Sequence, residues 1–254
     1  RPLVRFGLLT DPHYADKPAS GSRIYRDSDD KLADAIRVFD EREVDFLIET
    51  GDFKDQGPDE AATLAYLRAI ESEFRKFNGP TYHVLGNHDM DNISKARFLA
   101  AVTNTGIARD RTYYSFDARG VHFVVLDGNY RRDGTDYDHG NFDWTDANIP
   151  RPQLDWLAAD LASAEAPAIV FIHQLLDGEG SHYVNNAAAV RTVLEASGKV
   201  TAVFQGHQHS GGHSRIHGIH YHTLKAMVEG PHPQHNAFAL VEVRSDGRVV
   251  IDGY

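Results

Sequence analysis

The sequence predicts an α/β fold in which parallel βαβ units lead into an antiparallel C-terminal part. Short apolar runs of strand length alternate with segments whose apolar residues recur at helical spacing, a pattern typical of parallel sheets. The C-terminal part carries further strand-like runs without intervening helical segments, which predicts antiparallel pairing. Because no internal repeat or linker-like composition divides the chain, residues 1–254 are predicted to form a single domain.

The first half of the chain is predicted to alternate strands and helices. The expected elements are strand 4–10, helix 28–42, strand 46–50, helix 58–78 and strand 81–85. Each strand is an apolar run that ends at turn residues. In the first helix Leu32, Ile36 and Phe39 share one face. The second helix begins near Pro58 and ends before Gly79, which is ordinary helix punctuation.

The second half is predicted to be richer in strands. The expected elements are a hairpin of strands 113–117 and 121–127, helix 152–163, strand 168–172, helix 186–197, strand 200–205, and antiparallel candidates 216–223, 238–243 and 248–252. A short loop containing Gly120 closes the hairpin, and Gly198 stops the last helix. A polar and aromatic insert separates the hairpin from the helix at about 128–151, and loops of this length in compact domains are usually functional.

Composition limits the classes of partner. The chain has 26 Lys and Arg against 37 Asp and Glu, a formal net charge of −11. Nucleic acids and anionic membranes are bound through Lys and Arg, so this charge weighs against long nucleic acid. No apolar stretch approaches the roughly 20 residues that cross a bilayer, so no membrane partner is expected. With no cysteine, disulfide frameworks, thiolate metal sites and cysteine nucleophiles are excluded.

The cellular compartment and the oligomeric state do not follow from the composition. We expect a soluble protein, either cytoplasmic or exported. The chain begins at Arg1 rather than Met, which indicates a truncated or processed N-terminus.

Histidine, aspartate and asparagine residues follow five of the predicted strands. They are Asp11 and His13 after the first strand, Asp52 after the second, Asn87, His88 and Asp89 after the third, His173 after strand 168–172, and His207 and His209 after strand 200–205. In open α/β sheets the carboxyl ends of the strands converge on one crevice, so these residues are predicted to form one site.

The residue types in this set predict a dinuclear metal centre. The set contains nitrogen and oxygen donors without sulfur, which suits Mn, Fe, Zn or Co and is too rich in nitrogen for Ca or Mg. Asp52 has two carboxylate oxygens and can bridge two ions. Two ions roughly 3.5 to 4 Å apart would activate a bridging water and hold both oxygens of an in-line displacement. The expected reaction is therefore hydrolysis of a phosphate ester by a metal-bridging hydroxide.

From Leu8 to about His209 the sequence resembles the calcineurin-like metallophosphoesterases. The resemblance rests on five motifs in order: Asp-x-His, Gly-Asp, Gly-Asn-His-Asp, a lone His and Gly-His-x-His. The resemblance implies a four-layer α/β/β/α fold of two packed mixed β-sheets flanked by helices. It implies two metal ions, Mn, Fe or Zn. One ion would be held by Asp11, His13, Asp52 and His209, and the other by Asp52, Asn87, His173 and His207. It further implies that His88, oriented by Asp89, is the unligated histidine near the leaving group. We expect His88 to act there as a general acid or hydrogen-bond donor.

A narrower resemblance concerns the manganese-dependent ADP-ribose/CDP-alcohol diphosphatase group. The residues that carry it are Phe6 to Asp11, Tyr14 to Asp16 and Arg23 to Arg26. It implies cleavage of phosphodiester or pyrophosphate bonds in small nucleotide-like substrates. Two alternatives stay open: a phosphomonoesterase, and a non-catalytic interaction scaffold on the same fold. Serine-hydrolase, P-loop and dinucleotide-binding motifs are absent from the sequence.

The insert at 128–151 is the predicted substrate loop. Guanidinium groups suit phosphate and aromatic rings suit a base. The candidate substrate residues are Tyr130, Arg131, Arg132, Phe142, Trp144 and, in a later loop, His213. The alternative is that Phe142 and Trp144 only pack the insert onto the domain and that the arginines are solvated.

Overall fold

The computed structural model describes residues 2–253. The helices are α1 (Ser28–Glu41), α2 (Glu60–Phe74), α3 (Lys95–Ala101), α4 (Arg151–Ser163) and α5 (Ala187–Ser197), with short 3-10 turns at Tyr25–Asp27 and His88–Met90. The strands are β1 (Pro2–Leu9), β2 (Phe46–Glu49), β3 (Thr81–His83), β4 (Tyr114–Ala118), β5 (Val121–Val125), β6 (Ala168–Phe171), β7 (Val200–Gln205), β8 (Ser210–Ile216), β9 (Ile219–Lys225), β10 (Ala239–Arg244) and β11 (Val249–Gly253).

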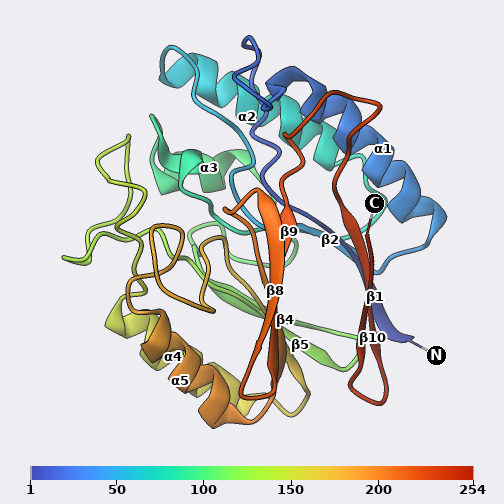
Figure 1. The fold of residues 1–254 in the computed structure, drawn as a ribbon, viewed down its shortest axis with the longest axis vertical. Coiled ribbons are helices and arrows are strands. Elements are labelled where there is room, and N and C mark those ends of the chain that lie inside the picture. The colour runs from blue at the N-terminus through green and yellow to red at the C-terminus, as the bar shows by residue number, and fades with distance from the viewer. Residues whose placement is uncertain (1, 254) are drawn as a thin grey trace.

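Within the described residues the strands form two mixed sheets that pack face to face. One has five strands in the order β11-β10-β1-β2-β3, and the other has six in the order β4-β5-β6-β7-β9-β8. Helices α1 and α2 cover the outer side of the first sheet, and α4 and α5 cover the second (Figure 1). The four-layer α/β/β/α arrangement expected from the sequence is confirmed.

Each layer boundary is filled by apolar side chains that alternate along the strands. On β1, Phe6 and Leu8 point between the sheets, while Leu9 faces α1 and α2. The ring of Phe6 stacks on Phe46 at 5.0 Å and meets Phe123 of the other sheet edge-on at 5.6 Å. This aromatic layer sets the distance between the two sheets and therefore the relative position of the loops at their ends.

Local signals explain where the helices begin and end. The side chain of Asp59 accepts a hydrogen bond from the backbone N–H of Ala62, which caps α2. Ser94 caps α3 in the same way through the N–H of Arg97. Gly198 ends α5 with a φ of +64°, the left-handed conformation that favours glycine.

Two elements differ from the sequence predictions. Helix α3 was not anticipated, although Ser94 followed by Phe98 and Leu99 is a signal for it. The predicted strand 216–223 corresponds to β9 from residue 219 on but starts too early, because the chain turns at His217 and Gly218 (φ +47° and +91°) between β8 and β9. Strand β8 carries two glycines and polar residues, so it lacked a strand pattern in the sequence. β9 pairs in parallel with β7 and is antiparallel only to β8.

The parallel strands bring their carboxyl ends to one edge of the molecule. β1, β2 and β3 run in parallel, as do β5, β6 and β7. The insert is irregular between β5 and α4, with no helix or strand in residues 126–150. Among residues 2–253, no helix has the length and apolar character needed to cross a bilayer.

Candidate metal centre

Seven side chains expected to hold metal are brought together at the carboxyl ends of the strands. Asp11 and His13 follow β1, Asp52 follows β2, Asn87 follows β3, His173 follows β6, and His207 and His209 follow β7. Both sheets contribute, so their face-to-face packing assembles the site. All seven are buried except His209, which is half-buried.

The first group of possible ligands consists of Asp11, His13 and His209. One ligand atom from each lies within 4.8 Å of the others. The Nε2 atom of His13 is 3.5 Å from Oδ1 of Asp11, and Nε2 of His209 is 3.3 Å from the same oxygen. These three atoms surround a common point on which one ion would be centred.

The second group consists of Asp52, His173 and His207. The Nε2 atom of His173 is 3.1 Å from Oδ2 of Asp52, and Nδ1 of His207 is 3.2 Å from the same imidazole nitrogen. Oδ2 of Asp52 is also 3.5 Å from Nε2 of His13 in the first group. Asp52 therefore lies between the two groups, as a bridging carboxylate must.

The donor atoms fit a pair of divalent ions. Oδ1 of Asp11, Nε2 of His13 and Oδ1 of Asn87 are buried without a hydrogen-bond partner. A buried polar atom left unpaired costs about 1–3 kcal/mol, so three such atoms among the predicted ligands favour a bound ion that pairs them. Nitrogen and oxygen donors in this mixture suit Mn, Fe, Zn or Co.

The electrostatics of the cluster also favour a cation. Burial opposes the charged form of His173, but the carboxylates of Asp52 and Asp11 outweigh it and raise its pKa to about 10. Burial would raise the pKa of Asp52, yet the His173 and His88 imidazoles hold it well below the usual range. For His207, burial and the His173 charge lower the pKa to about 3. The positive charge of His173 therefore balances the carboxylates of Asp11 and Asp52, and bound divalent ions would balance them in its place.

Hydrogen-bond acceptors behind the imidazoles fix the orientation of three rings. Nδ1 of His13 is 3.1 Å from Asp55, and Nδ1 of His209 is 2.6 Å from Glu229. His173 places Nδ1 2.8 Å from the backbone carbonyl oxygen of Thr50. Such partners select the tautomer that presents the other nitrogen to the metal. Sequence reasoning missed Asp55 and Glu229, because neither lies in the strand-end motif that contains the histidine it contacts.

The backbone around the centre is held in an uncommon conformation. Asp11, His13, Asp52 and His207 have φ values of +50°, +45°, +54° and +65°. Left-handed conformations are rare for residues other than glycine and cost of order 1–3 kcal/mol each, so their concentration at one point indicates a functional constraint. Gly86 allows the close approach of two of these loops, because a Cβ atom there would lie 2.1 Å from the backbone nitrogen of Asp52.

His88 lies at the rim of the centre, and its orienting partner differs from the prediction. Nδ1 of His88 is 2.7 Å from Oδ2 of Asp91, and the ring lies 4.8 Å from that of His13. Asp89 does not orient His88. Its carboxylate instead accepts hydrogen bonds from the backbone N–H groups of Gly86, Asp52 and Phe53 and so binds the two loops together. The short 3-10 turn after Asn87 places the side chain of residue 89 in the interior and that of residue 91 beside the His88 imidazole.

The insert brings one of its three predicted aromatic residues to the centre. The ring of Trp144 lies 5.5 Å from His207 and 5.2 Å from His182, and its side chain is 41% exposed. Phe142 instead stacks on Tyr137 at 3.9 Å and packs against the core beneath α1 to α3. The prediction of Phe142 as a substrate residue is corrected to a packing role.

The remaining predicted substrate residues contact other parts of the molecule. Tyr130 is half-buried beneath Lys95, whose Nζ lies 3.5 Å from the ring centre. Arg131 pairs with Asp133 at 3.7 Å, and Arg132 is exposed. His213 contacts His220 and His222 of the neighbouring strand. Within residues 2–253, none of these four side chains forms a hydrogen bond, ion pair or ring contact with a candidate metal ligand, so their role in binding substrate stays a prediction.

Comparison with known proteins identifies relatives along almost the entire chain. The sequence profile of the calcineurin-like phosphoesterase family matches residues 4–211. A manganese-dependent ADP-ribose/CDP-alcohol diphosphatase of Oryza sativa is 29% identical over 98% of this chain and 91% of its own length. A protein of the same name from Danio rerio is 26% identical over 99% of this chain and 95% of its own length.

Solved structures share the fold. A dimetal phosphatase from Danio rerio superposes with a TM-score of 0.85 at 24% identity and covers 100% of this chain and 96% of its own. GAP50, the anchor in the inner membrane complex of Plasmodium, superposes with a TM-score of 0.63 at 15% identity over 98% of this chain and 84% of its own. At these identities the similarity concerns the arrangement of helices and strands.

Proposed function

Because this chain belongs to the calcineurin-like phosphoesterase family, we propose that it hydrolyses pyrophosphate or phosphodiester bonds of small nucleotide-like substrates with two divalent metal ions. The main support is that Asp52 lies between two sets of nitrogen and oxygen donors, several of which are buried without a hydrogen-bond partner. A diphosphate substrate is favoured over a phosphomonoester because the full-length relatives are named as ADP-ribose/CDP-alcohol diphosphatases.

The proposed ligands of one ion are Asp11, His13, Asp52 and His209. For the other ion they are Asp52, Asn87, His173 and His207. When bound, two such ions supply a nucleophile derived from water and neutralise the charge that develops on the phosphoryl oxygens. The protein holds this donor set with Asp55 and Glu229 behind two of the imidazoles, which keeps the coordinating nitrogens directed inward.

His88 is proposed as the proton donor to the leaving oxygen. Its Nδ1 is engaged by Asp91, so Nε2 remains to face a substrate at the rim of the centre. The side chain is 31% exposed, which lets a substrate reach it. The carboxylate of Asp91 stabilises the protonated ring and fixes its orientation.

Trp144 is proposed to stack on the base of the substrate. The exposed indole stands over the imidazole of His207, with His182 completing the wall. Base stacking on an aromatic side chain is worth about 1–3 kcal/mol and tolerates different bases. We propose that residues 1–254 act as one domain whose insert, about 128–151, forms the substrate loop through Trp144.

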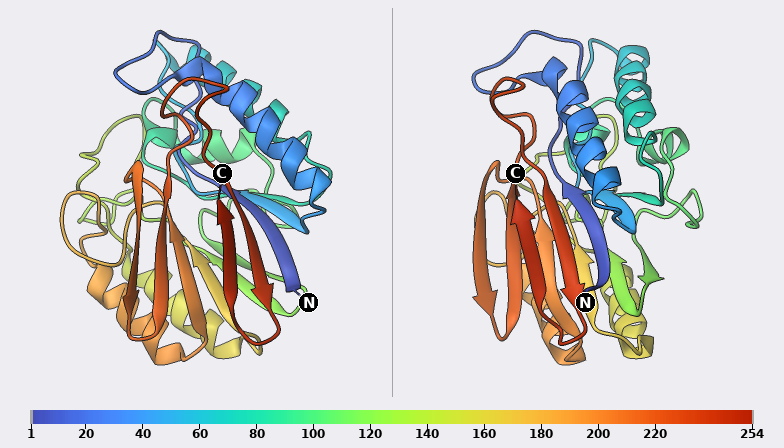
Figure 2. Two further views of the ribbon diagram at one scale, coloured as in Figure 1. Left: turned by 45° about the vertical axis from the view of Figure 1, so that its right-hand side comes forward. Right: turned by 90° about the vertical axis from the view of Figure 1, so that its right-hand side faces the viewer.

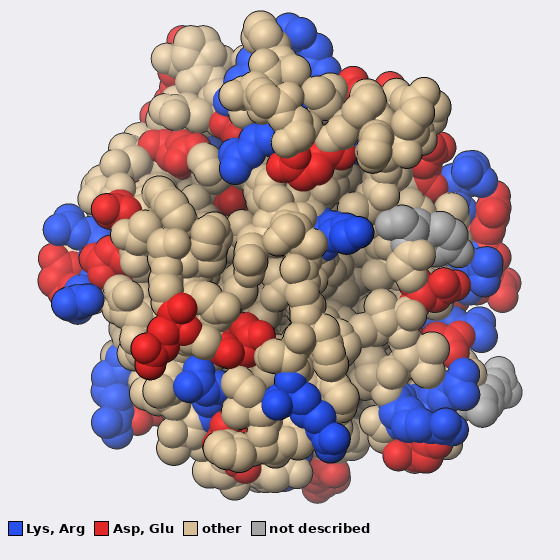
Figure 3. All heavy atoms as spheres, in the orientation of Figure 1, with Lys and Arg blue, Asp and Glu red and all other residues tan. Residues whose placement is uncertain are grey.

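A small substrate agrees with the surface charge. On the face seen in Figure 3, Lys and Arg are interspersed with Asp and Glu and form no continuous basic area. With a net charge of −11, a long polyanion would be repelled, whereas a small phosphate ester reaches the ions themselves.

The decisive test is a substrate screen after metal reconstitution. The protein is loaded with Mn²⁺, Fe²⁺ or Zn²⁺ and assayed with ADP-ribose, CDP-choline, cyclic nucleotides, p-nitrophenyl phosphate and its bis ester. We expect the highest kcat/KM for ADP-ribose or CDP-choline with Mn²⁺. A preference for p-nitrophenyl phosphate would favour the phosphomonoesterase. No turnover with any metal would favour the scaffold, a role for which the fold of GAP50 offers a precedent.

A further inference from the structure

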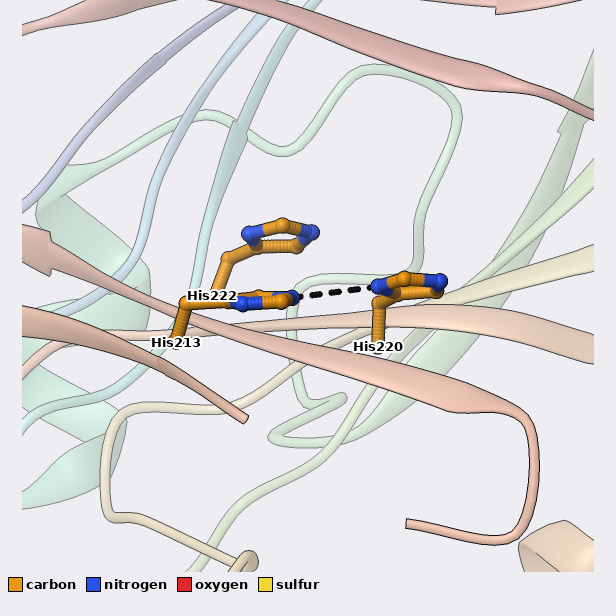
Figure 4. A group of neighbouring side chains, drawn as sticks. All are labelled: His213, His220 and His222. Atoms are coloured by element: carbon orange, nitrogen blue, oxygen red, sulfur yellow. Dashed lines mark hydrogen bonds between the residues drawn. The ribbon is translucent and has the colours of Figure 1, made fainter. Parts of the chain in front are cut away.

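Three histidines that the proposed phosphoesterase reaction does not use lie together on the hairpin of β8 and β9. His213 of β8 and His222 of β9 are direct partners across the hairpin, and His220 precedes His222 by two residues on the same face. The ring centres are 4.6 Å apart for His213 and His222 and 5.3 Å apart for His213 and His220 (Figure 4). The register of the hairpin therefore places three imidazoles side by side.

The ring nitrogens are close enough to share an ion. Nε2 of His213 is 3.1 Å from Nδ1 of His220, and one nitrogen from each of the three rings lies within 4.8 Å of the others. Two imidazoles on one tetrahedral ion, each at about 2.0–2.1 Å, hold their nitrogens roughly 3.3 Å apart. His213 and His220 already have nearly this separation. The ring of His222 is stacked over that of His213, so its side chain would have to rotate to direct a nitrogen at the same point.

Unlike several other histidines of the chain, these three have no acidic partner within the described residues. His217, at the turn of the same hairpin, pairs with Glu195 at 2.8 Å. In the cluster, His213 and His220 share one hydrogen bond, and the side chain of His222 makes none. Burial and the neighbouring His213 and His220 lower the pKa of His222 to about 4, so its ring is neutral with a free lone pair at neutral pH.

The cluster opens into a cavity at the edge of the two-sheet sandwich. This cavity of about 540 Å³ is lined by all three histidines, by Thr201 of β7 and by residues 247–250 at the β10–β11 turn. A second cavity of about 410 Å³ also has His222 in its lining. Figure 2 shows the β10–β11 hairpin beside the β8–β9 edge that carries the cluster. An ion has both room and a path to the three nitrogens.

We propose that His213, His220 and His222 form a separate, all-imidazole site for a first-row divalent ion, with Zn²⁺ as the best-suited occupant. Imidazole donors suit Zn²⁺, Cu²⁺ and Ni²⁺, whereas Mn²⁺ favours a donor set that includes carboxylate oxygens, as the main centre does. Arg215 lies opposite His220 in the hairpin and repels a cation, so affinity rests on the metal–nitrogen bonds. The ion would cross-link the edge strand β8 to β9. Its remaining coordination position would be open to the cavity.

The test counts bound zinc. Wild type and His213→Asn are dialysed against Zn²⁺, and bound metal per chain is measured by inductively coupled plasma mass spectrometry. His213 is exposed, so its replacement leaves the packing in place. We expect wild type to retain one more Zn²⁺ per chain than the variant. The apo proteins should melt at the same temperature, while Zn²⁺ should raise the Tm of wild type by roughly 5 °C more than that of the variant.

Two further variants complete the design. His220→Asn should lose the same equivalent of zinc, because it removes a second ligand of the same site. His217→Ala removes an exposed histidine of the same hairpin outside the cluster and should retain the wild-type zinc content. Equal zinc content in wild type, His213→Asn and His220→Asn would overturn the proposal, whatever the activity of the main centre.

Discussion

The imidazole of His88 is held by Asp91, with 2.7 Å between Nδ1 and the carboxylate oxygen, while the adjacent Asp89 bonds only to backbone N–H groups and does not touch the ring. The two neighbouring acids therefore have separable effects. Asp91 positions the imidazole of His88, the proposed proton donor, and Asp89 joins the loops after β2 and β3.

For Asp91→Asn we expect kcat to fall about 10- to 100-fold with a poor leaving group such as phenol, because the ring loses the carboxylate that stabilises its protonated form. With p-nitrophenol, which leaves without a proton, the decrease should be small. Asp91→Glu should restore part of the rate. Steady-state kinetics with the two esters measures the contrast, and equal losses with both would argue against the proton-donor role of His88.

For Asp89→Asn we expect a loss of stability. The carboxyl group accepts from Gly86, Asp52 and Phe53, and intramolecular hydrogen bonds of this kind are worth about 0.5–1.5 kcal/mol each. An amide can still accept at one oxygen, so Tm should fall by several degrees and metal affinity should weaken with it. Thermal melts and metal titration provide the measurements. A normal Tm with lost activity would instead indicate a direct part in the reaction.

Gly86→Ala should prevent assembly of the centre. An added Cβ would lie 2.1 Å from the backbone nitrogen of Asp52 and 2.3 Å from its Oδ1, so one of the two loops must move. We expect the variant to bind fewer than two Mn²⁺ ions per chain and to have a lower Tm. Gly212→Ala is the matched control, because nothing lies within 4 Å of its added Cβ. Full metal occupancy in Gly86→Ala would contradict the tight packing of these loops.

The stability of the protein should fall between about pH 6.5 and pH 9. His83 is buried with Nδ1 2.9 Å from Glu49 and Nε2 3.0 Å from Glu71. Burial lowers its pKa, but the two carboxylates outweigh burial and raise it from 6.5 to about 9. A raised pKa in the folded state stabilises the protein fully below 6.5, and this contribution disappears as the pH rises through 9.

The measurement for this prediction is Tm at pH 6, 7.5 and 9. The variant His83→Gln should be less stable at pH 6 and should show a flatter dependence over the same range, because glutamine does not titrate. An identical pH dependence in both proteins would mean that other groups control it.

Trp144→Ala should raise KM for ADP-ribose and CDP-choline by roughly tenfold, in keeping with the loss of one stacked base. It should leave p-nitrophenyl phosphate almost unaffected, because that substrate has no base. Phe142→Ala is the comparison: its ring stacks on Tyr137 in the core, so its loss should lower Tm instead. A similar rise in KM for all substrates would assign Trp144 to loop packing.

The strand ends and the polar residues that follow them are encoded locally in the sequence. The runs before Asp11, Asp52 and His173 are apolar and short, and each is followed directly by a turn that carries a polar residue. Such patterns are local in the chain, so they can be recognised without knowing where the strands lie. The alternation of strands and helices, and with it the α/β class, follows from the same local periodicity.

The hydrogen-bond partner of each imidazole, by contrast, depends on how the chain folds in three dimensions. Asp55 meets His13 from 42 positions away and Glu229 meets His209 from 20 positions away, because strand order and loop conformation place them there. Likewise, the turn at His217 and Gly218 sets the register that brings His213 next to His222. Contacts between distant residues depend on how the strands pair and on how tight turns orient side chains. Neither can be read from the periodicity of residues along the chain.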